Sequence, residues 1–175
     1  MAAAMLKWLD DGLGRVEDAF LAMSHGVIAG LVVAAVFFRY VLNDPLIWTE
    51  EIVVLLFTWM LFVGLASAFR QRMHIRIDVL LLMLPLPARA VLGALATLAT
   101  IATLTGLAWF GTEQAIILAT TETPMLRLSA AWGVSALPVG AVLSVIHVLR
   151  HAIDHGLAET LWPSDLVAGH EGSVT

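Results

Sequence analysis

The sequence has no cysteine, and only 13% of its 175 residues are charged. Without cysteine, the chain cannot form a disulfide framework, a thiolate nucleophile or a cysteine-ligated metal site. Nine lysines and arginines and a formal net charge of −5 leave no dense basic surface for nucleic acid. We also find no nucleophile–base pair, no phosphate-binding loop and no regular histidine–carboxylate spacing. We therefore predict that the chain is not an enzyme and holds no metal or other cofactor.

Apolar residues, in contrast, make up 60% of the chain and gather in four runs without charge. A helix needs about 20 apolar residues to cross the ~30 Å hydrocarbon core of a bilayer. The links between the runs are short, which favours antiparallel neighbours. The pattern predicts an all-α membrane protein with four antiparallel transmembrane helices. These spans cover approximately residues 19–38, 52–69, 90–112 and 128–149.

The segments outside the spans complete a three-part organisation. Residues 1–18 place apolar side chains at helical spacing among charged ones, which indicates a short amphipathic helix in the headgroup layer. Residues 19–150 form the transmembrane domain, and residues 151–175 form a tail. Between the second and third spans, residues 79–84 are apolar but too short to cross, so we expect a second interfacial helix, capped by Asp78.

The distribution of lysine and arginine predicts the orientation, because short cytoplasmic loops carry the excess of these residues. One side of the predicted topology would carry Lys7, Arg15, Arg70, Arg72, Arg76, Arg89 and Arg150, and the other side only Arg39 and Arg127. We therefore expect both termini in the cytoplasm.

Three of the spans carry small residues at helical spacing, which let helices approach closely in lipid. The first span has Ala22, Gly26, Gly30 and Ala34, the third starts a small face with Gly93 and Thr97, and the fourth has Ser129, Gly133, Gly140 and Ser144. Spacing alone does not distinguish packing within the chain from packing against a partner.

The segment from Arg39 to Glu51 is the charged interruption between the first two spans. Asp44 is predicted to cap a helix that starts at Pro45, which would place Glu50 and Glu51 near the positive end of that helix. The two carboxylates either pair with Arg39 or a partner's basic group, which we favour, or bind a cation or relay protons.

Two later prolines complete the predicted helix boundaries. Thr123 and Pro124 are expected to cap and start the fourth helix in the same way as Asp44 and Pro45, and Pro138 is expected to kink that helix.

Two functional alternatives remain open from the residues alone. His25 and His147 are the only titratable side chains within the apolar runs, and a pair of imidazoles on facing helices would suit a haem-b electron-transfer subunit. A self-sufficient small transporter or channel is the other alternative. The spans lack the broken, polar mid-membrane segment of free-standing transporters, which favours a membrane partner that performs the transport.

Several segments resemble the small membrane subunit of tripartite ATP-independent periplasmic (TRAP) transporters. The resemblance covers roughly residues 16–150. It is carried by residues 38–51 (Arg-Tyr, Asn-Asp-Pro and Trp-Thr-Glu-Glu), Gly64, Arg70, residues 74–78 (His-Ile-Arg-Ile-Asp), residues 123–126 and residues 136–140.

The resemblance implies a scaffold subunit in the bacterial inner membrane. Such a subunit would form a heterodimer with a large permease subunit that carries the substrate and sodium sites, while a periplasmic binding protein delivers an organic acid anion. It would not bind substrate itself. The residues expected to serve structure or the partner interface are Arg39, Asn43, Pro45, Trp48, Glu50, Glu51, Arg70, His74, Asp78, Pro124 and Pro138.

Overall fold

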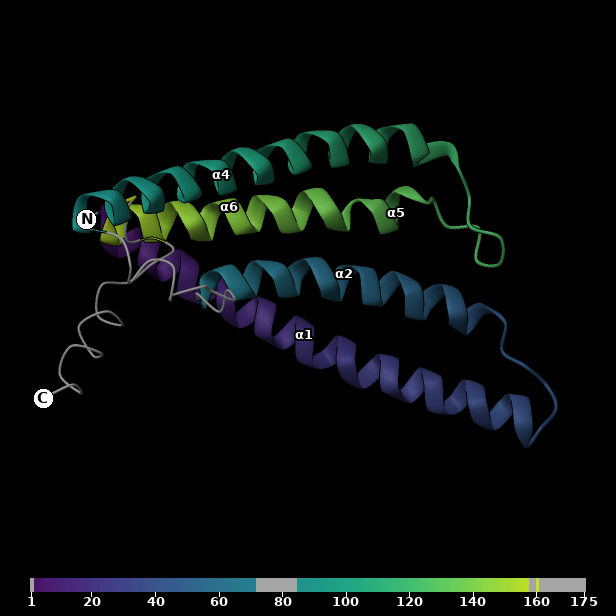
Figure 1. Cartoon of the computed structure of the whole chain (residues 1–175). Coiled ribbons are helices and arrows are strands. Elements are labelled where there is room, and N and C mark those ends of the chain that lie inside the picture. The colour runs from purple at the N-terminus through teal and green to yellow at the C-terminus, as the bar shows by residue number, and fades with distance from the viewer. Residues whose placement is uncertain (1, 72–84, 158–159, 161–175) are drawn as a thin grey trace, which may run out of the picture.

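The computed structural model describes residues 2–71, 85–157 and 160. Those residues form helices almost throughout (Figure 1). The helices are α1 (Ala2–Tyr40), α2 (Trp48–Arg70), α4 (Leu86–Ile117), the 3₁₀ turn η1 (Leu118–Thr120), α5 (Ala131–Val134) and α6 (Ala136–His155). The predicted interfacial helix at 79–84, the site candidates His74 and Asp78, and nearly all of the predicted tail beyond residue 157 lie outside the described residues.

The long helices lie side by side in a row whose order is α1, α2, α6, α4 (Figure 1). Long helices that are consecutive along the chain run antiparallel, whereas the central neighbours α2 and α6 run parallel. α2 packs between α1 and α6, and α6 packs between α2 and α4. α1 runs obliquely to the rest and touches α6 only slightly. We call the end of the row near residues 12–18 and 70 the terminal end, and the end with residues 41–47 and 121–130 the hairpin end.

Within the described part of the chain, four helical segments are long and apolar enough to cross a membrane, which confirms the predicted fold class. They are Gly12–Tyr40, Trp48–Arg70, Pro87–Thr120 and Ala131–His155. All four are longer than the charge-free runs in the sequence, because the helices continue into the polar residues that flank each run. The chain is therefore a multi-pass helical membrane protein.

Residues 2–18 join the first span in one uninterrupted helix, rather than forming a separate one. Gly12 and Gly14 weaken a helix intrinsically, but Gly14 is buried in contact with Arg70 of α2. Tertiary packing thus offsets the low propensity at this point. The location of the first turns in the headgroup layer remains a prediction.

The predicted start of the second helix is wrong: α2 begins at Trp48, not at Pro45. Asn43 adopts a left-handed φ of 53°, and the amide of Asp44 donates to the carbonyl of Phe38 at 3.1 Å. This geometry closes the C-terminal end of α1. Asp44 therefore ends one helix rather than capping the next, and Pro45 follows as a stop.

The predicted start of the fourth helix at Thr123 and Pro124 is also wrong. The amide of Thr123 donates to the carbonyl of Leu128 at 2.8 Å, and a short antiparallel bridge joins Glu122 to Ser129. Arg127 takes a left-handed φ of 51° within this turn. The backbone amides that a helix would have needed are bonded across the turn, so the helix is delayed until Ala131.

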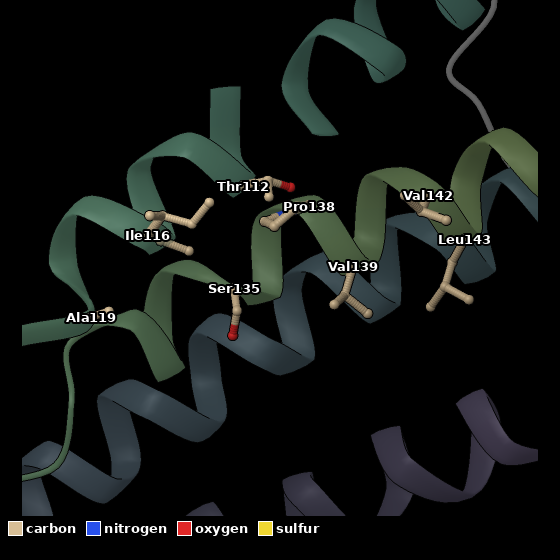
Figure 2. Close-up of a pocket in the computed structure, with 9 residues that line it drawn as sticks. Thr112, Ile116, Ala119, Ser135, Pro138, Val139, Val142 and Leu143 are labelled. Carbon is tan, nitrogen blue, oxygen red and sulfur yellow. The ribbon is translucent and has the colours of Figure 1, made fainter. Parts of the chain in front are cut away.

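The last span is interrupted at Ser135, between α5 and α6. Pro138 has no amide to donate to the carbonyl one turn earlier, which accounts for a break at this place. An apolar groove of about 540 Å³ lies beside the break, between α6 and the end of α4. Figure 2 shows Ser135, Pro138 and Val139 on one side of it and Thr112 and Ile116 on the other.

Small residues allow the central helices to approach closely. A Cβ atom added to Gly140 of α6 would lie 2.6 Å from the carbonyl oxygen of Phe62 on α2. A Cβ atom added to Gly111 of α4 would lie 2.9 Å from Cδ of Pro138. Apart from His147, the fully buried side chains nearby are short or β-branched, such as Thr97, Ser144 and Val148. Close backbone contact, rather than a bulky core, holds the α2–α6–α4 part of the row together.

Candidate functional site

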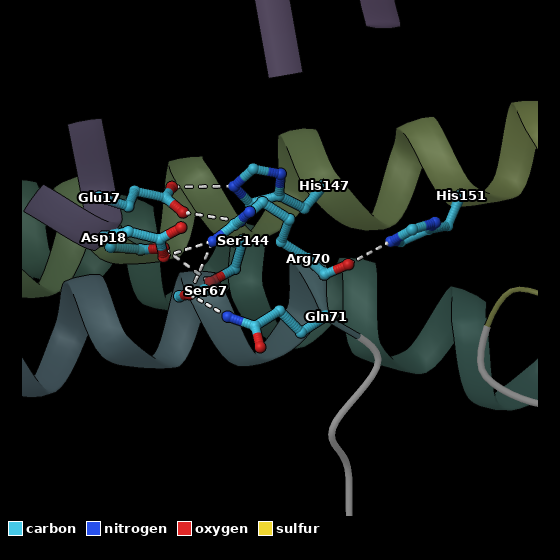
Figure 3. A network of polar contacts seen from close by, with 9 residues as sticks. Glu17, Asp18, Ser67, Arg70, Gln71, Ser144, His147 and His151 are labelled. Atoms are coloured by element: carbon cyan, nitrogen blue, oxygen red, sulfur yellow. Dashed lines mark hydrogen bonds and ion pairs between the residues drawn. The ribbon is translucent and has the colours of Figure 1, made fainter. Parts of the chain in front are cut away.

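At the terminal end, a cluster of polar side chains joins three helices. We call Glu17, Asp18, Arg70, His147 and His151 the terminal clamp (Figure 3). Glu17 Oε1 of α1 lies 2.9 Å from Nε2 of His147 on α6, and its Oε2 lies 3.4 Å from Nε of Arg70 on α2. Arg70 also binds the Asp18 carboxylate, and its carbonyl accepts a hydrogen bond of 3.0 Å from Nε2 of His151.

The centre of the terminal clamp is buried. The side chains of His147 and Glu17 are 0% and 2% exposed, and that of Arg70 is 21% exposed. Gly14 makes room for this arrangement, because a Cβ atom there would lie 2.6 Å from Nη1 of Arg70. Charged groups taken out of water destabilise a protein unless they bind partners with good geometry. Each member of the cluster thus depends on the others.

The terminal clamp fixes the position of α1. Outside it, α1 packs almost entirely on α2, and its contact with α6 is slight. The Glu17–His147 contact therefore ties α1 to a helix that it otherwise barely touches. His151 adds a donor for the last carbonyl of α2, which a helix C-terminus leaves without an intrahelical partner.

At the hairpin end, a second cluster joins the end of α1, the start of α2 and the turn that precedes α5. We call Arg39, Glu50 and Glu51 the hairpin clamp. Nη2 of Arg39 donates to Oε1 of Glu50 at 2.9 Å, with the two side chains 54% and 69% exposed. Glu51 accepts hydrogen bonds from the amides of Met125 and Leu126, at 2.7 and 2.9 Å.

The two carboxylates of the hairpin clamp therefore have different partners. An exposed ion pair such as Arg39–Glu50 contributes only about 0–1 kcal/mol. Glu51 instead binds two backbone amides of the turn that precedes α5, and hydrogen bonds from amides to an ionised carboxylate are stronger than those between neutral groups. Glu51 thus links the start of α2 to the turn that precedes α5.

The other candidates from the sequence fall at the chain's turns. Asn43 ends α1, Pro45 lies between α1 and α2, and Trp48 opens α2 with 40% of its surface exposed. Pro124 lies in the turn after η1, and Pro138 lies just after the break at Ser135. Whether these residues contact a partner protein remains a prediction.

The two intramembrane histidines are not equivalent. His147 is fully buried and engages Glu17 through Nε2, whereas His25 is exposed on α1. A bis-histidine haem site needs a ring nitrogen of each histidine for the iron. The Nε2 atom of His147 is already in contact with a carboxylate, so the geometry does not favour the haem alternative.

Sequence reasoning missed Glu17 and Asp18 as site residues, because both fall within residues 1–18, which were predicted to form a separate interfacial helix. One signal was available. In an antiparallel hairpin, the start of the first helix lies beside the end of the second, and here two acids precede the first apolar run while Arg70 follows the second. Opposite charges at adjacent helix ends indicate an ion pair. No comparable pattern in the sequence indicates the contact between Glu17 and His147, which lies on the last helix.

The fold and the two clamps define a class of protein: a four-span helical membrane protein whose described titratable groups, His25 apart, gather at the two ends of the row. The family model for the DctQ component of tripartite ATP-independent periplasmic transporters matches residues 28–155. The chain belongs to this family, the small permease subunits of TRAP transporters.

Curated relatives agree with this assignment. The chain is 29% identical to the sialic acid TRAP transporter small permease protein SiaQ of Vibrio cholerae, over 83% of this chain and 84% of the relative. It is 28% identical to the C4-dicarboxylate TRAP transporter small permease protein DctQ of the same organism, over 89% of this chain and 76% of the relative. These relatives are transporter permease proteins rather than enzymes.

A third relative has a different length. The chain is 28% identical to the sialic acid TRAP transporter permease protein SiaT of Haemophilus influenzae, and the match covers 79% of this chain but only 22% of SiaT. Most of that permease therefore lies outside the matching region.

Proposed function

We propose that this chain is a scaffold in the bacterial inner membrane, with both termini in the cytoplasm. It would support a large permease subunit of a sodium-coupled TRAP transporter. In this proposal a periplasmic binding protein delivers an organic acid anion to the permease, and the small subunit does not bind that anion. The names of the relatives support two substrate classes, sialic acids and C4-dicarboxylates.

One observation carries the scaffold role. Charged side chains at both ends of the spans bind one another or the backbone: Glu17 with His147 and Arg70, Arg39 with Glu50, and Glu51 with the 125–126 amides. A site for a carboxylate substrate would need a positive group left available within the membrane. Here Arg39 and Arg70 already hold acids, so they serve helix packing.

Reconstitution tests the proposal. Liposomes that contain this chain and the large permease, supplied with binding protein and an inward sodium gradient, are expected to take up radiolabelled sialic acid or succinate. Liposomes with this chain alone should take up no more than protein-free liposomes, because it has no substrate site.

Two controls decide the result. A sodium-free buffer on both sides should abolish uptake by the complete system. Uptake of either substrate by this chain alone would contradict the scaffold role, and full uptake by the permease without this chain would contradict the need for a scaffold.

A further inference from the structure

The surface of α1 that faces away from α2 presents a row of small residues and one histidine. We call Ala22, His25, Gly26, Ala29, Gly30 and Val33 the outer α1 face. All six are exposed, and they recur at the three- and four-residue spacing that places side chains on one side of a helix. The opposite side of α1 buries Glu17 and Ser24.

Several glycines of the last two spans are occupied within the chain, although Gly106 of α4 is open. Gly140 and Gly111 sit against Phe62 and Pro138, and a Cβ atom at Gly133 would lie 3.8 Å from Leu55. At Gly26 and Gly30, by contrast, an added Cβ atom would meet nothing within 4 Å among the described residues. Glycine lowers helix stability by about 1 kcal/mol relative to alanine, so two glycines on an open face point to a close helix contact outside this chain.

His25 adds a chemical reason to expect a partner on this face. At about 1.5 Å per residue, Asp18 and Arg39 are about 31 Å apart along α1, which matches the ~30 Å of hydrocarbon. His25 then lies about 10 Å inside the hydrocarbon from Asp18. His147, the other histidine of the apolar runs, bonds to Glu17, but no hydrogen bond joins His25 to the described residues. Lipid tails offer an imidazole no hydrogen bond, and a polar group at such a depth normally faces another protein segment.

We propose that the outer α1 face is where a transmembrane helix of the large permease packs, with a hydrogen-bonding side chain of that helix meeting the imidazole of His25. This inference rests on the proposed function. The occupant is argued from SiaT, a permease protein in which a region similar to this chain is continuous with much more polypeptide. The family match begins at residue 28. His25 lies before it, so the family match says nothing about this histidine.

The terminal clamp gives the face a fixed direction. It holds Glu17 and Asp18 of α1 against α2 and α6. Because the helix is rigid and continuous to Tyr40, anchoring its buried side also sets the direction in which Gly26 and Gly30 point. The permease helix would thus extend the row beyond α1.

Co-purification of the complex tests the inference. The tagged chain is co-expressed with the large permease subunit of the same organism, and the permease recovered with it is measured. The double variant Gly26→Leu/Gly30→Leu should lower recovery about tenfold, since overpacking a tight contact commonly has an effect of that size. The matched control is Gly106→Leu, at an equally open glycine of α4. It should change recovery by no more than about twofold.

The histidine is tested by two substitutions of different chemistry. His25→Gln keeps a hydrogen-bonding side chain and should retain the complex, whereas His25→Leu should lower recovery about threefold, the usual size of a hydrogen bond between membrane helices. Equal recovery with both variants, or unchanged recovery with the double glycine variant, would overturn the inference.

Cross-linking identifies the neighbour even where a glycine variant fails to fold. The chain has no cysteine, so Ala29→Cys labelled with a photoreactive maleimide reports on one position. An adduct with the permease supports the inference, while a dimer of this chain, or adducts with lipid alone, overturns it. Ala102→Cys, exposed on α4, is the control and should give no permease adduct.

The co-purification distinguishes failure of this inference from failure of the proposed function. If the wild-type chain retains no permease at all, the proposed function fails. If the wild-type chain retains the permease and the outer-face variants retain as much, only this inference fails.

Discussion

Substituting Gly140 with alanine is expected to lower the free energy of unfolding of this chain by about 2 kcal/mol, the range for overpacked sites. The added Cβ atom would lie 2.6 Å from the carbonyl oxygen and 2.8 Å from the carbonyl carbon of Phe62. These are backbone atoms in the middle of α2, so the helix as a whole must move to relieve the contact. The loss should outweigh the roughly 1 kcal/mol that alanine gains over glycine in helix propensity.

The measurement is an SDS titration of the purified chain in mixed micelles, followed by circular dichroism. Gly106→Ala is the matched control, because its added Cβ atom would meet nothing within 4 Å. We expect this control to unfold at the same or a higher SDS fraction than the wild type. If Gly140→Ala were as stable as Gly106→Ala, the close α2–α6 contact would not hold the row together.

The second large effect is expected for Glu17→Ala, which should destabilise the chain by about 3 kcal/mol or more. The substitution removes the shared acid between Arg70 and His147, and breaking a buried ionic contact by deleting one partner typically costs about 3–5 kcal/mol. The same SDS titration measures the loss. Hydrogen exchange should rise in the α1 backbone around residues 14–24, because α1 loses its tie to α6.

A double variant separates the contact from general damage to α1. Glu17→Met combined with His147→Leu removes both polar partners, while Asp18 still binds Arg70. The double variant should therefore lose less free energy of unfolding than the sum of the losses in the two single variants. Glu113→Ala, an exposed acid on α4, is the control and should shift stability by no more than about 0.5 kcal/mol. Strictly additive losses would show that Glu17 and His147 do not act together.

The fold class was predictable because it follows from hydrophobicity. Four long apolar runs joined by short links permit little else in a bilayer, where every backbone amide needs an internal partner. The helix ends were harder. Asp44 followed by Pro45 is a strong signal for the start of a helix. Because Asn43 is left-handed, however, the amide of Asp44 bonds to the carbonyl of Phe38 and closes the preceding helix. Local residues supported both outcomes, and the geometry of the turn decided between them.

The candidate site was predictable only where charges lie near each other along a hairpin. Arg39 and Glu50 flank one short connection, and the structure brings them together. The contact between Glu17 and His147 spans 130 positions and depends on which helix lies beside which in the row. The helix order α1, α2, α6, α4 is a tertiary property that apolar periodicity does not encode.

The central claim is that the chain crosses the membrane four times, with its hairpin end outside the cytoplasm and its terminal end inside. Cysteine accessibility tests it most directly, since each introduced thiol is unique in this chain. A membrane-impermeant maleimide applied to intact spheroplasts should label Tyr40→Cys and Met125→Cys at once. It should label Gln71→Cys and Leu157→Cys only after the membrane is opened. Labelling of Tyr40→Cys and Gln71→Cys from the same side would contradict the account.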